Sequence, residues 1–377
     1  MVSDCYVQIL NSIPIDWRTK HFVNYELKRQ NPAIGIKKMS FQKILLLWIY
    51  LGATETNVSK YKNFNECSHR FFFQGLIPNY LHLSEDIVNI CQQYNNKFFF
   101  ATLYDTKNRI PVYSATQLDL RSDNKSRYGD MFFIEPSLVK NVNHQKGNMI
   151  EFVPNKHANY GEKQALDTDY KGSGYDRGHL NPQLFNTKDS DSRYATNTFT
   201  NIAPQYGLFN KGTWNNMEET LLKTVKQECK FLGAKIYVVV GVEPSTNRYI
   251  VKQIKNKPVN RVNVPRFYWT AICCDTSTAI ASDHHEEGWS FAYLASNINA
   301  SDVNVSFDPV DKFLKNQYLK IFADFKRKNG PDIIGCQFRK DNAIRIIQNI
   351  AKTAGPIFEP NPTARFEPEK KKIYKSG

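Results

Sequence analysis

The chain has 377 residues, of which 41% are apolar and 23% charged, a composition that predicts a packed core and excludes a wholly disordered chain. The 50 Lys and Arg residues outnumber the 36 Asp and Glu residues, which leaves a formal net charge of +14. This surplus favours polyanionic partners, namely nucleic acid, anionic membranes or sulfated glycans, without choosing among them.

The first predicted element is a secretory signal peptide at residues 39–53. Lysines precede an apolar run from Ile44 to Leu51, and small residues follow it, a pattern typical of such signals. A buried strand or helix is the alternative, because a membrane-spanning helix needs about 20 residues. No later segment is long and apolar enough to span a bilayer, so we expect no stable membrane insertion. We expect residues 1–38 to be an upstream extension of unknown role or to result from a mispredicted start, because Met39 stands where a signal peptide should begin.

The cysteines support a secreted, extracellular protein. Of the seven cysteines, Cys5 precedes the signal and six follow it, an even number that suits up to three disulfides in an oxidising compartment. The sequence does not choose among the pairings. Cys273 and Cys274 are adjacent on a predicted strand, so their side chains point to opposite faces. Candidate glycosylation sites follow the signal at Asn57, Asn124, Asn299 and Asn304.

The remaining elements predict a single α+β domain over residues 54–354. The apolar and β-branched runs predict four strands, at Phe98–Tyr104, Arg109–Tyr113, Lys235–Gly241 and Val262–Cys273. The turn Asp105–Asn108 joins the first two of these strands. A further strand is predicted at Trp289–Leu294, and helices at Val310–Phe325 and Ala343–Lys352. Residues 120–175 are polar and predict loops with short helices. Residues 355–377 are rich in proline and lysine and predict a disordered basic tail.

Residues Asp169 to Glu219 contain the groups that phosphodiester hydrolysis needs. The attacking water must lose a proton, and the neutral imidazole of His179 accepts one near pH 7. Arg177 can stabilise charge on the phosphoryl oxygens. Gly178, between them, allows a tight backbone bend and leaves the site uncrowded.

A helix after these residues predicts a metal site. Asn210, Trp214 and Glu218 are spaced by four, so they share roughly one helical face. The Asn210 carbonyl oxygen is a hard ligand suited to Mg²⁺, and Glu218 can accept hydrogen bonds from water on the metal. The core-facing stripe of this helix comprises Trp214, Met217, Leu221 and Val225.

Each of these residues taken singly has a commoner structural explanation: a packed histidine, a surface ion pair, or the exposed face of a helix. Their joint, ordered occurrence resembles the DNA/RNA non-specific endonuclease family, which includes endonuclease G and bacterial extracellular nucleases. The motifs are Asp176-Arg177-Gly178-His179, the segment from Asn201 to Gln205, and Asn210 with Trp214 and Glu218. The resemblance covers roughly residues 95–330.

The resemblance implies an α+β sandwich with a central antiparallel sheet and a ββα-metal active site of the His-Me finger type. It implies that His179 is the general base and that Asn210 is the metal ligand for Mg²⁺, with Mn²⁺ as the alternative ion. Arg177 and Glu218 would support the phosphate and the metal-bound water, Asn201 would order the site, and Asp176 would hold its loop. The implied partners are DNA and RNA, bound through the phosphate backbone; the oligomeric state stays open.

Segments nearer the N-terminus resemble one branch of the family, the endonuclease domain-containing 1 proteins. These segments are Phe64-Asn-Glu-Cys67, Ile90 to Tyr94 and Ala101 to Tyr113. One departure concerns Leu222, which stands where many members have an arginine one turn after the glutamate. The alternative function is therefore a catalytically weakened nuclease fold that binds nucleic acid or other polyanions.

Overall fold

The computed structural model describes residues 63–80, 85–119, 129, 131–139, 147–308, 310, 319–322, 336, 340–354 and 358–359. All of them belong to one compact unit, Ser59–Gly377. The predicted extension at 1–38 and the predicted signal at 39–53 lie outside the described residues.

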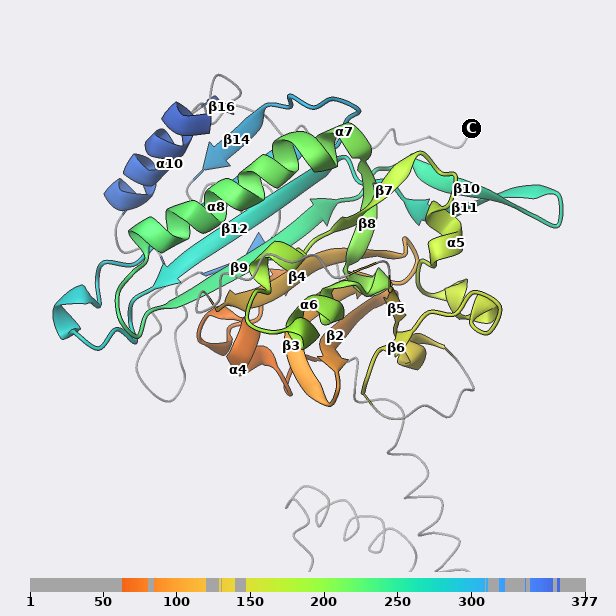
Figure 1. Ribbon diagram of the computed structural model, residues 1–377, viewed down its shortest axis with the longest axis horizontal. Coiled ribbons are helices and arrows are strands. Elements are labelled where there is room, and N and C mark those ends of the chain that lie inside the picture. The colour runs from red at the N-terminus through yellow and green to blue at the C-terminus, as the bar shows by residue number, and fades with distance from the viewer. Residues whose placement is uncertain are drawn as a thin grey trace, which may run out of the picture. The chain divides into compact units, whose positions relative to one another are not determined.

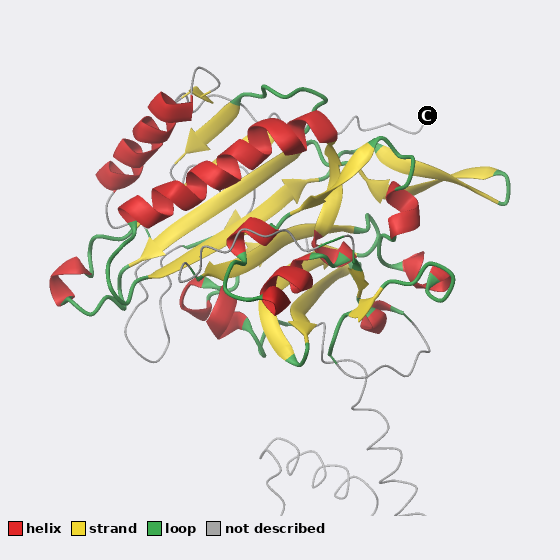
Figure 2. Cartoon of the chain, in the orientation of Figure 1, coloured by secondary structure: helices red, strands yellow, loops and turns green. Residues whose placement is uncertain are grey.

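In the described residues, an eight-stranded sheet forms the centre of this unit (Figures 1 and 2). Its strand order is β16-β14-β13-β12-β9-β4-β3-β2, and every pair is antiparallel except β14 with β16. The strands are β2 Ile87–Tyr94, β3 Lys97–Asp105, β4 Ile110–Leu118, β9 Lys235–Glu243, β12 Phe267–Asp275, β13 Trp289–Ser296, β14 Val305–Asp308 and β16 Phe358–Glu359. The predicted α+β class with a central antiparallel sheet is confirmed.

Strand β9 shows why the sheet is buried on both faces. Its alternating residues Ile236, Val238, Val240 and Val242 belong to one hydrophobic cluster, which we call the front cluster. Tyr237 and Val239 point the other way, into the back cluster, together with Phe64, Phe72 and Phe73. A run of β-branched residues without polar alternation fits this two-sided burial.

Two long helices cover the front face, α8 at Asn215–Glu228 and α10 at Lys340–Ala354 (Figure 1). The predicted stripe of α8 is confirmed, because Trp214, Met217, Leu221 and Val225 are all buried in the front cluster. The shorter helices are α4 Ser68–Phe71, α5 Asp167–Tyr170, α6 Ser190–Thr196 and α7 Gly207–Phe209, with a π-helical turn at Asn210–Trp214. The 3-10 turns are Phe73–Gly75, Pro136–Leu138, Ala158–Glu162, Gln183–Phe185, Phe199–Asn201 and Ser282–His284.

Pairs of shorter strands lie outside the main sheet. They are β1 Asn79–Tyr80 with β15 Leu319–Lys320, β5 Phe133–Ile134 with β6 Ile150–Glu151, β7 Tyr175–His179 with β8 Ile202–Tyr206, and β10 Tyr249–Ile254 with β11 Lys257–Asn263.

Three element predictions are wrong in part. The segment predicted as the helix Val310–Phe325 contains strand β15, which pairs with β1. The strand predicted from Val262 begins at Phe267, because Val262 belongs to β11 and pairs with Ile250. The predicted disordered tail at 355–377 contains β16, whose backbone pairs with β14. In each case a long-range strand pairing overrides the local pattern, and such a partner cannot be read from local periodicity.

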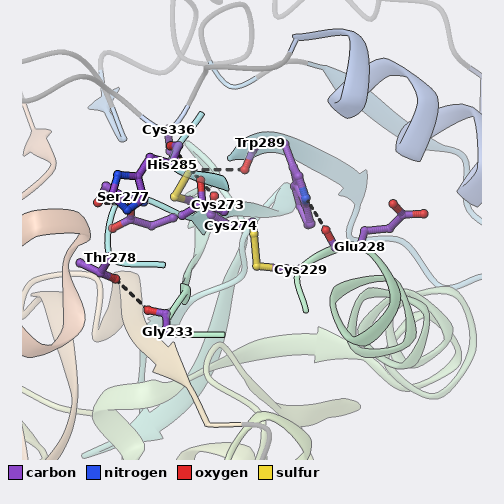
Figure 3. Close-up of a disulfide and its surroundings, with 12 residues drawn as sticks. Glu228, Cys229, Gly233, Cys273, Cys274, Ser277, Thr278, His285, Trp289 and Cys336 are labelled. Atoms are coloured by element: carbon purple, nitrogen blue, oxygen red, sulfur yellow. Dashed lines mark hydrogen bonds between the residues drawn. A yellow bond between two sulfur atoms is a disulfide. The ribbon is translucent and has the colours of Figure 1, made fainter. Parts of the chain in front are cut away.

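Three disulfides join the six cysteines that follow the predicted signal: Cys67–Cys91, Cys229–Cys274 and Cys273–Cys336. The opposite orientations predicted for Cys273 and Cys274 are confirmed, because Cys274 lies in the front cluster and Cys273 in the back cluster. Figure 3 shows Cys229, directly after α8, bonded to Cys274 beside Trp289, whose indole N–H donates to the Glu228 carbonyl (2.9 Å). The end of α8 is thereby tied to the sheet.

None of the helices in the described part of the chain combines the length and the apolar character that crossing a membrane requires.

Candidate active site

The motif Asp176-Arg177-Gly178-His179 lies on β7, which pairs antiparallel with β8. The chain then passes through α7 and the π-helical turn into α8, so the strand-strand-helix order expected of a ββα unit is present. Strand β8 is attached to the main sheet, because the Tyr268 hydroxyl donates to the Ala203 carbonyl (3.0 Å) and the Asn297 amide donates to the Pro204 carbonyl (3.0 Å).

Gly178 is required for close packing rather than for a bend. Strand β7 is extended at this residue, so the expected tight bend is absent. A Cβ at position 178 would lie 2.3 Å from Oε1 and 2.7 Å from Cβ of the buried Gln205 on β8. A larger residue would therefore push apart the two strands that hold His179.

His179 is held by a buried amide that the sequence analysis did not select. Its Nε2 lies 2.9 Å from Oδ1 of Asn197, which is 1% exposed. The amide is oriented, because Nδ2 of Asn197 donates to the carbonyls of Gly129 (3.3 Å) and Met131 (3.1 Å). Gln183 also donates to the same Oδ1 (2.8 Å).

This arrangement selects one tautomer of the histidine. Oδ1 of Asn197 can only accept, so Nε2 of His179 must carry the proton in the neutral ring. The lone pair then lies on Nδ1. The two nitrogens therefore differ: Nε2 holds the ring against Asn197, and Nδ1 carries the lone pair.

Asn201 lies behind the cleft and is completely buried. Its Oδ1 accepts from the Ser114 hydroxyl (2.9 Å) and from the Asn181 backbone N–H (3.0 Å), and its Nδ2 donates to the carbonyls of Asn181 and Thr196 (2.9 Å each). These four hydrogen bonds join β4, the turn after His179 and the end of α6. The position suits the predicted ordering role and leaves Asn201 without access to a substrate.

Arg177 is engaged on two sides. Its Nη1 donates to Oδ1 of Asp167 at 2.6 Å, and its guanidinium lies 4.3 Å from the centre of the Phe132 ring. The side chain remains about one-third exposed. Because a guanidinium has five N–H donors in a fixed plane, this pair holds the plane in place and is compatible with further contacts to a phosphate.

Asn210 begins the π-helical turn, which precedes α8. The prediction of one continuous helix through Asn210, Trp214 and Glu218 is therefore wrong. Gly212 breaks the helical geometry (φ −95°, ψ −110°), and α8 begins only at Asn215. The break is fixed from outside, because a Cβ at Gly212 would lie 2.7 Å from the Ser301 carbonyl oxygen, which accepts from Thr213 N–H (3.0 Å).

Asp176 orients the Asn210 side chain. Its Oδ2 accepts from Nδ2 of Asn210 (3.1 Å) and lies 3.2 Å from Nζ of Lys211. The Asn210 amide therefore turns its nitrogen toward Asp176 and its carbonyl oxygen away from it. This contact links Asp176 of β7 to the segment that is predicted to hold the metal.

A cleft of about 890 Å³ collects these side chains. Its lining residues come from α5, β7, α6, the π-helical turn and the start of α8: Gly129, Phe132, Asp167, Tyr170, Lys171, Tyr175, Asp176, Arg177, His179, Pro182, Gln183, Leu184, Thr187, Arg193, Asn197, Asn210, Lys211, Asn215, Glu218 and Glu219. Of the predicted site residues, His179, Arg177, Asn210 and Glu218 line the cleft, and Asn201 supports it from behind.

The donors in this cleft fit a hard divalent cation. Asn210, Asp176, Glu218 and Glu219 all supply oxygen atoms, the ligand type that Mg²⁺ prefers. In the described part of the chain, no three His, Cys, Asp or Glu side chains are grouped to hold a metal.

Leu222, one turn beyond Glu218, is partly buried against the front cluster.

Sequence reasoning missed Asn197 and Lys211 as members of the site. Asn197 contacts His179 across 18 positions of sequence through a fold-dependent hydrogen bond, so no local spacing signals it. Lys211 directly follows Asn210, and its proximity to Asp176 depends on how β7 meets the π-helical turn.

The chain is similar in sequence to known nucleases. The sequence profile of the DNA/RNA non-specific endonuclease family matches residues 84–326. The endonuclease domain-containing 1 protein of Homo sapiens is 33% identical over 216 residues, 56% of this chain and 39% of that protein. A nuclease of Nostoc sp. is 34% identical over 121 residues, 32% of this chain and 39% of that protein. The matched region thus spans about two fifths of each relative.

A solved chain from an EndoG/EndoGI complex is 21% identical, covers 59% of this chain and 82% of that chain, and gives a TM-score of 0.38. The family profile covers more than half of this sequence and includes β7, β8 and α8 with every residue of the predicted site. The chain belongs to the DNA/RNA non-specific endonuclease family.

Proposed function

We propose that this protein hydrolyses phosphodiester bonds in DNA and RNA, without sequence specificity and with a divalent cation, Mg²⁺ in the first place. The observation that carries the proposal is the convergence of His179, Asn210 and Glu218 in one cleft that also presents Arg177, Lys171 and Lys211. Contacts to the phosphate backbone carry no sequence information, so a site of this kind acts on any sequence.

His179 is the proposed general base. Because Asn197 holds Nε2, the attacking water gives its proton to Nδ1. The ring is also flanked by Phe132, at 6.2 Å between ring centres, which limits its rotation. The histidine is thus oriented before a substrate arrives.

Asn210 is the proposed protein ligand of the cation, through its carbonyl oxygen, and Glu218 would accept hydrogen bonds from the water around it. When bound, a divalent cation stabilises the negative charge on the phosphoryl and leaving oxygens. Arg177, held against Asp167, would contact a phosphoryl oxygen of the same substrate.

The second candidate function is a weakened nuclease that mainly binds nucleic acid or other polyanions. Leu222 favours it, because this position supplies an apolar contact to the front cluster and no charge. Lys223 beside it is exposed and could not clamp a phosphate with two parallel hydrogen bonds, as an arginine would.

A plasmid-nicking assay separates the two functions. With Mg²⁺ the full chain should convert supercoiled DNA to open-circular and linear forms and should degrade RNA, and EDTA should abolish both reactions. Tight binding of DNA without nicking, at any Mg²⁺ or Mn²⁺ concentration, would favour the second function and refute the first.

A magnesium titration tests Asn210 by itself. We expect Asn210→Ala to raise the Mg²⁺ concentration that gives half-maximal activity, because the neutral oxygen ligand is lost. Asn216→Ala is the matched control, since Asn216 is an exposed amide close by on α8 and does not line the cleft. Equal magnesium dependence in both variants would remove Asn210 from the site.

We also propose that the protein acts outside the cell. Six paired cysteines are compatible with an oxidising compartment, and Asn299 and Asn304 are exposed as glycosylation would require. Mass spectrometry of the secreted product should find an N-terminus near Ala53 to Glu55 and no free thiol among the six cysteines. A retained 1–53 segment with several alkylatable cysteines would refute secretion and leave the nuclease assignment intact.

A further inference from the structure

The hairpin β10–β11 extends beyond the rest of the described unit at the right of Figure 1. Residues 253–260 are all exposed. The connection is a tight turn at Lys255 and Asn256, whose φ angles of 50° and 59° are those of a two-residue hairpin turn. The hairpin is therefore a two-stranded ribbon with a β-bulge between Ile250 and Val251, and both of its faces are exposed to solvent near the tip.

The charge of the ribbon has one sign. Residues 249–260 include Lys252, Lys255 and Lys257 and no Asp or Glu. A surface of this kind attracts polyanions and repels cations. Lys255 lies in the turn and Lys257 directly after it, while Lys252 lies further back on β10.

One face of the ribbon combines charge with apolar surface. Paired residues share a face, and the register pairs Lys252 with Val259 and Ile254 with Lys257. Ile254 is 45% exposed and Val259 37% exposed. Lysines and aliphatic side chains thus alternate diagonally on this face.

The base of the ribbon is anchored at the rim of the cleft. Nζ of Lys252 donates to the carbonyl of Lys171 (3.0 Å), and Lys171 lines the cleft. Arg261 on β11 forms a largely buried ion pair with Asp169 of α5 (2.9 Å). The face with Lys252 is therefore turned toward the cleft, and the ribbon is fixed relative to it.

We propose that the β10–β11 hairpin is a docking arm for double-stranded DNA next to the scissile phosphate, an inference that rests on the proposed nuclease function. The major groove of B-form DNA admits a two-stranded ribbon. Seated there, Lys255 and Lys257 contact phosphates while Ile254 and Val259 contact the apolar edges of the groove. These contacts need no particular base sequence.

The size of the arm sets the length of DNA that it requires. Strand β10 has six residues, which at about 3.3 Å per residue gives a length of about 20 Å from its base to the turn. This equals about six base pairs at 3.4 Å each. A duplex confined to the cleft does not reach the arm, whereas a duplex several times longer does. The major groove of A-form RNA is narrow, so RNA duplexes gain less from the arm.

The test measures binding rather than cleavage, in the full chain with His179→Ala and Mg²⁺ present. Fluorescence anisotropy compares duplexes of about six and about 24 base pairs, so that only the longer one reaches the arm. The arm variant is Lys255→Gln with Lys257→Gln, and both positions are exposed. The control is Lys97→Gln with Lys352→Gln, which removes the same charge at exposed positions that do not line the cleft.

We expect the arm variant to bind the long DNA about tenfold more weakly at low salt and to reduce the slope of log affinity against log salt by about two. The loss should be smaller for the short DNA and for RNA duplexes, and the control should lose less than the arm variant. The proposal would be overturned if the arm variant lost equal affinity for the long and the short DNA, or for DNA and RNA duplexes. It would also be overturned if the control variant lost as much affinity as the arm variant.

An anionic membrane is the competing partner, because Ile254 and Val259 could also insert among lipids. If the arm variant keeps its affinity for the long DNA and loses binding to phosphatidylserine vesicles, the DNA arm is refuted. Because the assay needs no cleavage, the two proposals can fail separately. If the protein does not nick plasmid DNA but the arm variant loses affinity for the long DNA only, the proposed nuclease function is refuted. The proposed role of the hairpin in binding DNA is then retained.

Discussion

The two faces of the central sheet are held together by different means. On the back face, two of the three disulfides, Cys67–Cys91 and Cys273–Cys336, lie within a cluster of packed aromatic rings. Phe73, for example, meets Tyr237 edge to face at 6.0 Å between ring centres. On the front face, the third disulfide, Cys229–Cys274, ties the end of α8 to the sheet. The candidate active-site unit is attached there by hydrogen bonds of two buried amides, Asn201 to Ser114 and Asn297 to Pro204.

The difference reflects what each bond can control. A disulfide mainly restricts the unfolded chain and so raises the stability of the fold. It does little to position the side chains of an active site. A buried amide must satisfy both its donors and its acceptor, and it therefore fixes the orientation of whatever it contacts. We expect changes at the front to alter chemistry and changes at the back to alter stability.

The largest expected effect is that of His179→Ala, which should lower the cleavage rate by about 100-fold or more, the scale of a lost general base. Thermal unfolding should change little, because the side chain is only partly buried. The matched control is His284→Ala, in the turn Ser282–His284, which does not line the cleft. A folded His179 variant with a near-normal rate would assign the base elsewhere.

Removing a back-face disulfide should have the opposite signature. Cys273→Ala with Cys336→Ala should destabilise the fold by about 2–4 kcal/mol, while the rate below the unfolding transition changes little. The Cys67–Cys91 disulfide closes a shorter loop, with a separation of 24 residues against 63. Replacing both of these cysteines by alanine should therefore destabilise the fold by about 1 kcal/mol less. Calorimetry and kinetics on both variants check this; a large fall in rate with an unchanged melting temperature would break the division between the faces.

Gly178→Ala should affect both properties. The new methyl group would overlap Gln205, and separating β7 from β8 should cost about 1–3 kcal/mol and lower activity by displacing His179. Asn216→Ala is the control, because Asn216 is exposed on α8 and does not line the cleft. If the Gly178 variant melts and cleaves like this control, the close approach of Gly178 to β8 has no consequence.

The smallest expected effect concerns a surface ion pair between the two front helices. Arg345 of α10 donates to both carboxylate oxygens of Glu228 (3.1 and 2.7 Å), and this hydrogen bonding holds the pKa of Glu228 below its usual value. Because the pKa of Glu228 is lower in the folded state than in the unfolded state, the ion pair stabilises the fold above the unfolded-state pKa. This stability is lost as the pH falls through the folded-state pKa.

Arg345→Ala should therefore cost less than about 1 kcal/mol at neutral pH and nothing in strong acid. Denaturant unfolding at several pH values measures the difference. A constant cost across the whole range would assign the contact to packing rather than to charge.

Local sequence patterns were sufficient for much of the sheet and of helix α8. The turn after β3 follows from Asp105, whose carboxylate accepts from the backbone N–H groups of Lys107 and Asn108. The stripe of α8 follows from residue spacing, because burial of one helical face is a periodic property. The short strands β15 and β16 were not predicted, since two residues gain strand geometry only from a distant partner.

The sequence by itself determined the family, the candidate site residues and the even set of cysteines, because residue type and order carry that information. Only the tertiary structure decided which ring nitrogen of His179 contacts Asn197, how Asp176 turns the Asn210 amide, and which cysteines pair. It also placed the lysine-bearing hairpin at the rim of the cleft. These properties depend on contacts between residues far apart in the chain, and hydrogen bonds and disulfides form only where the packed core brings such residues within a few ångströms.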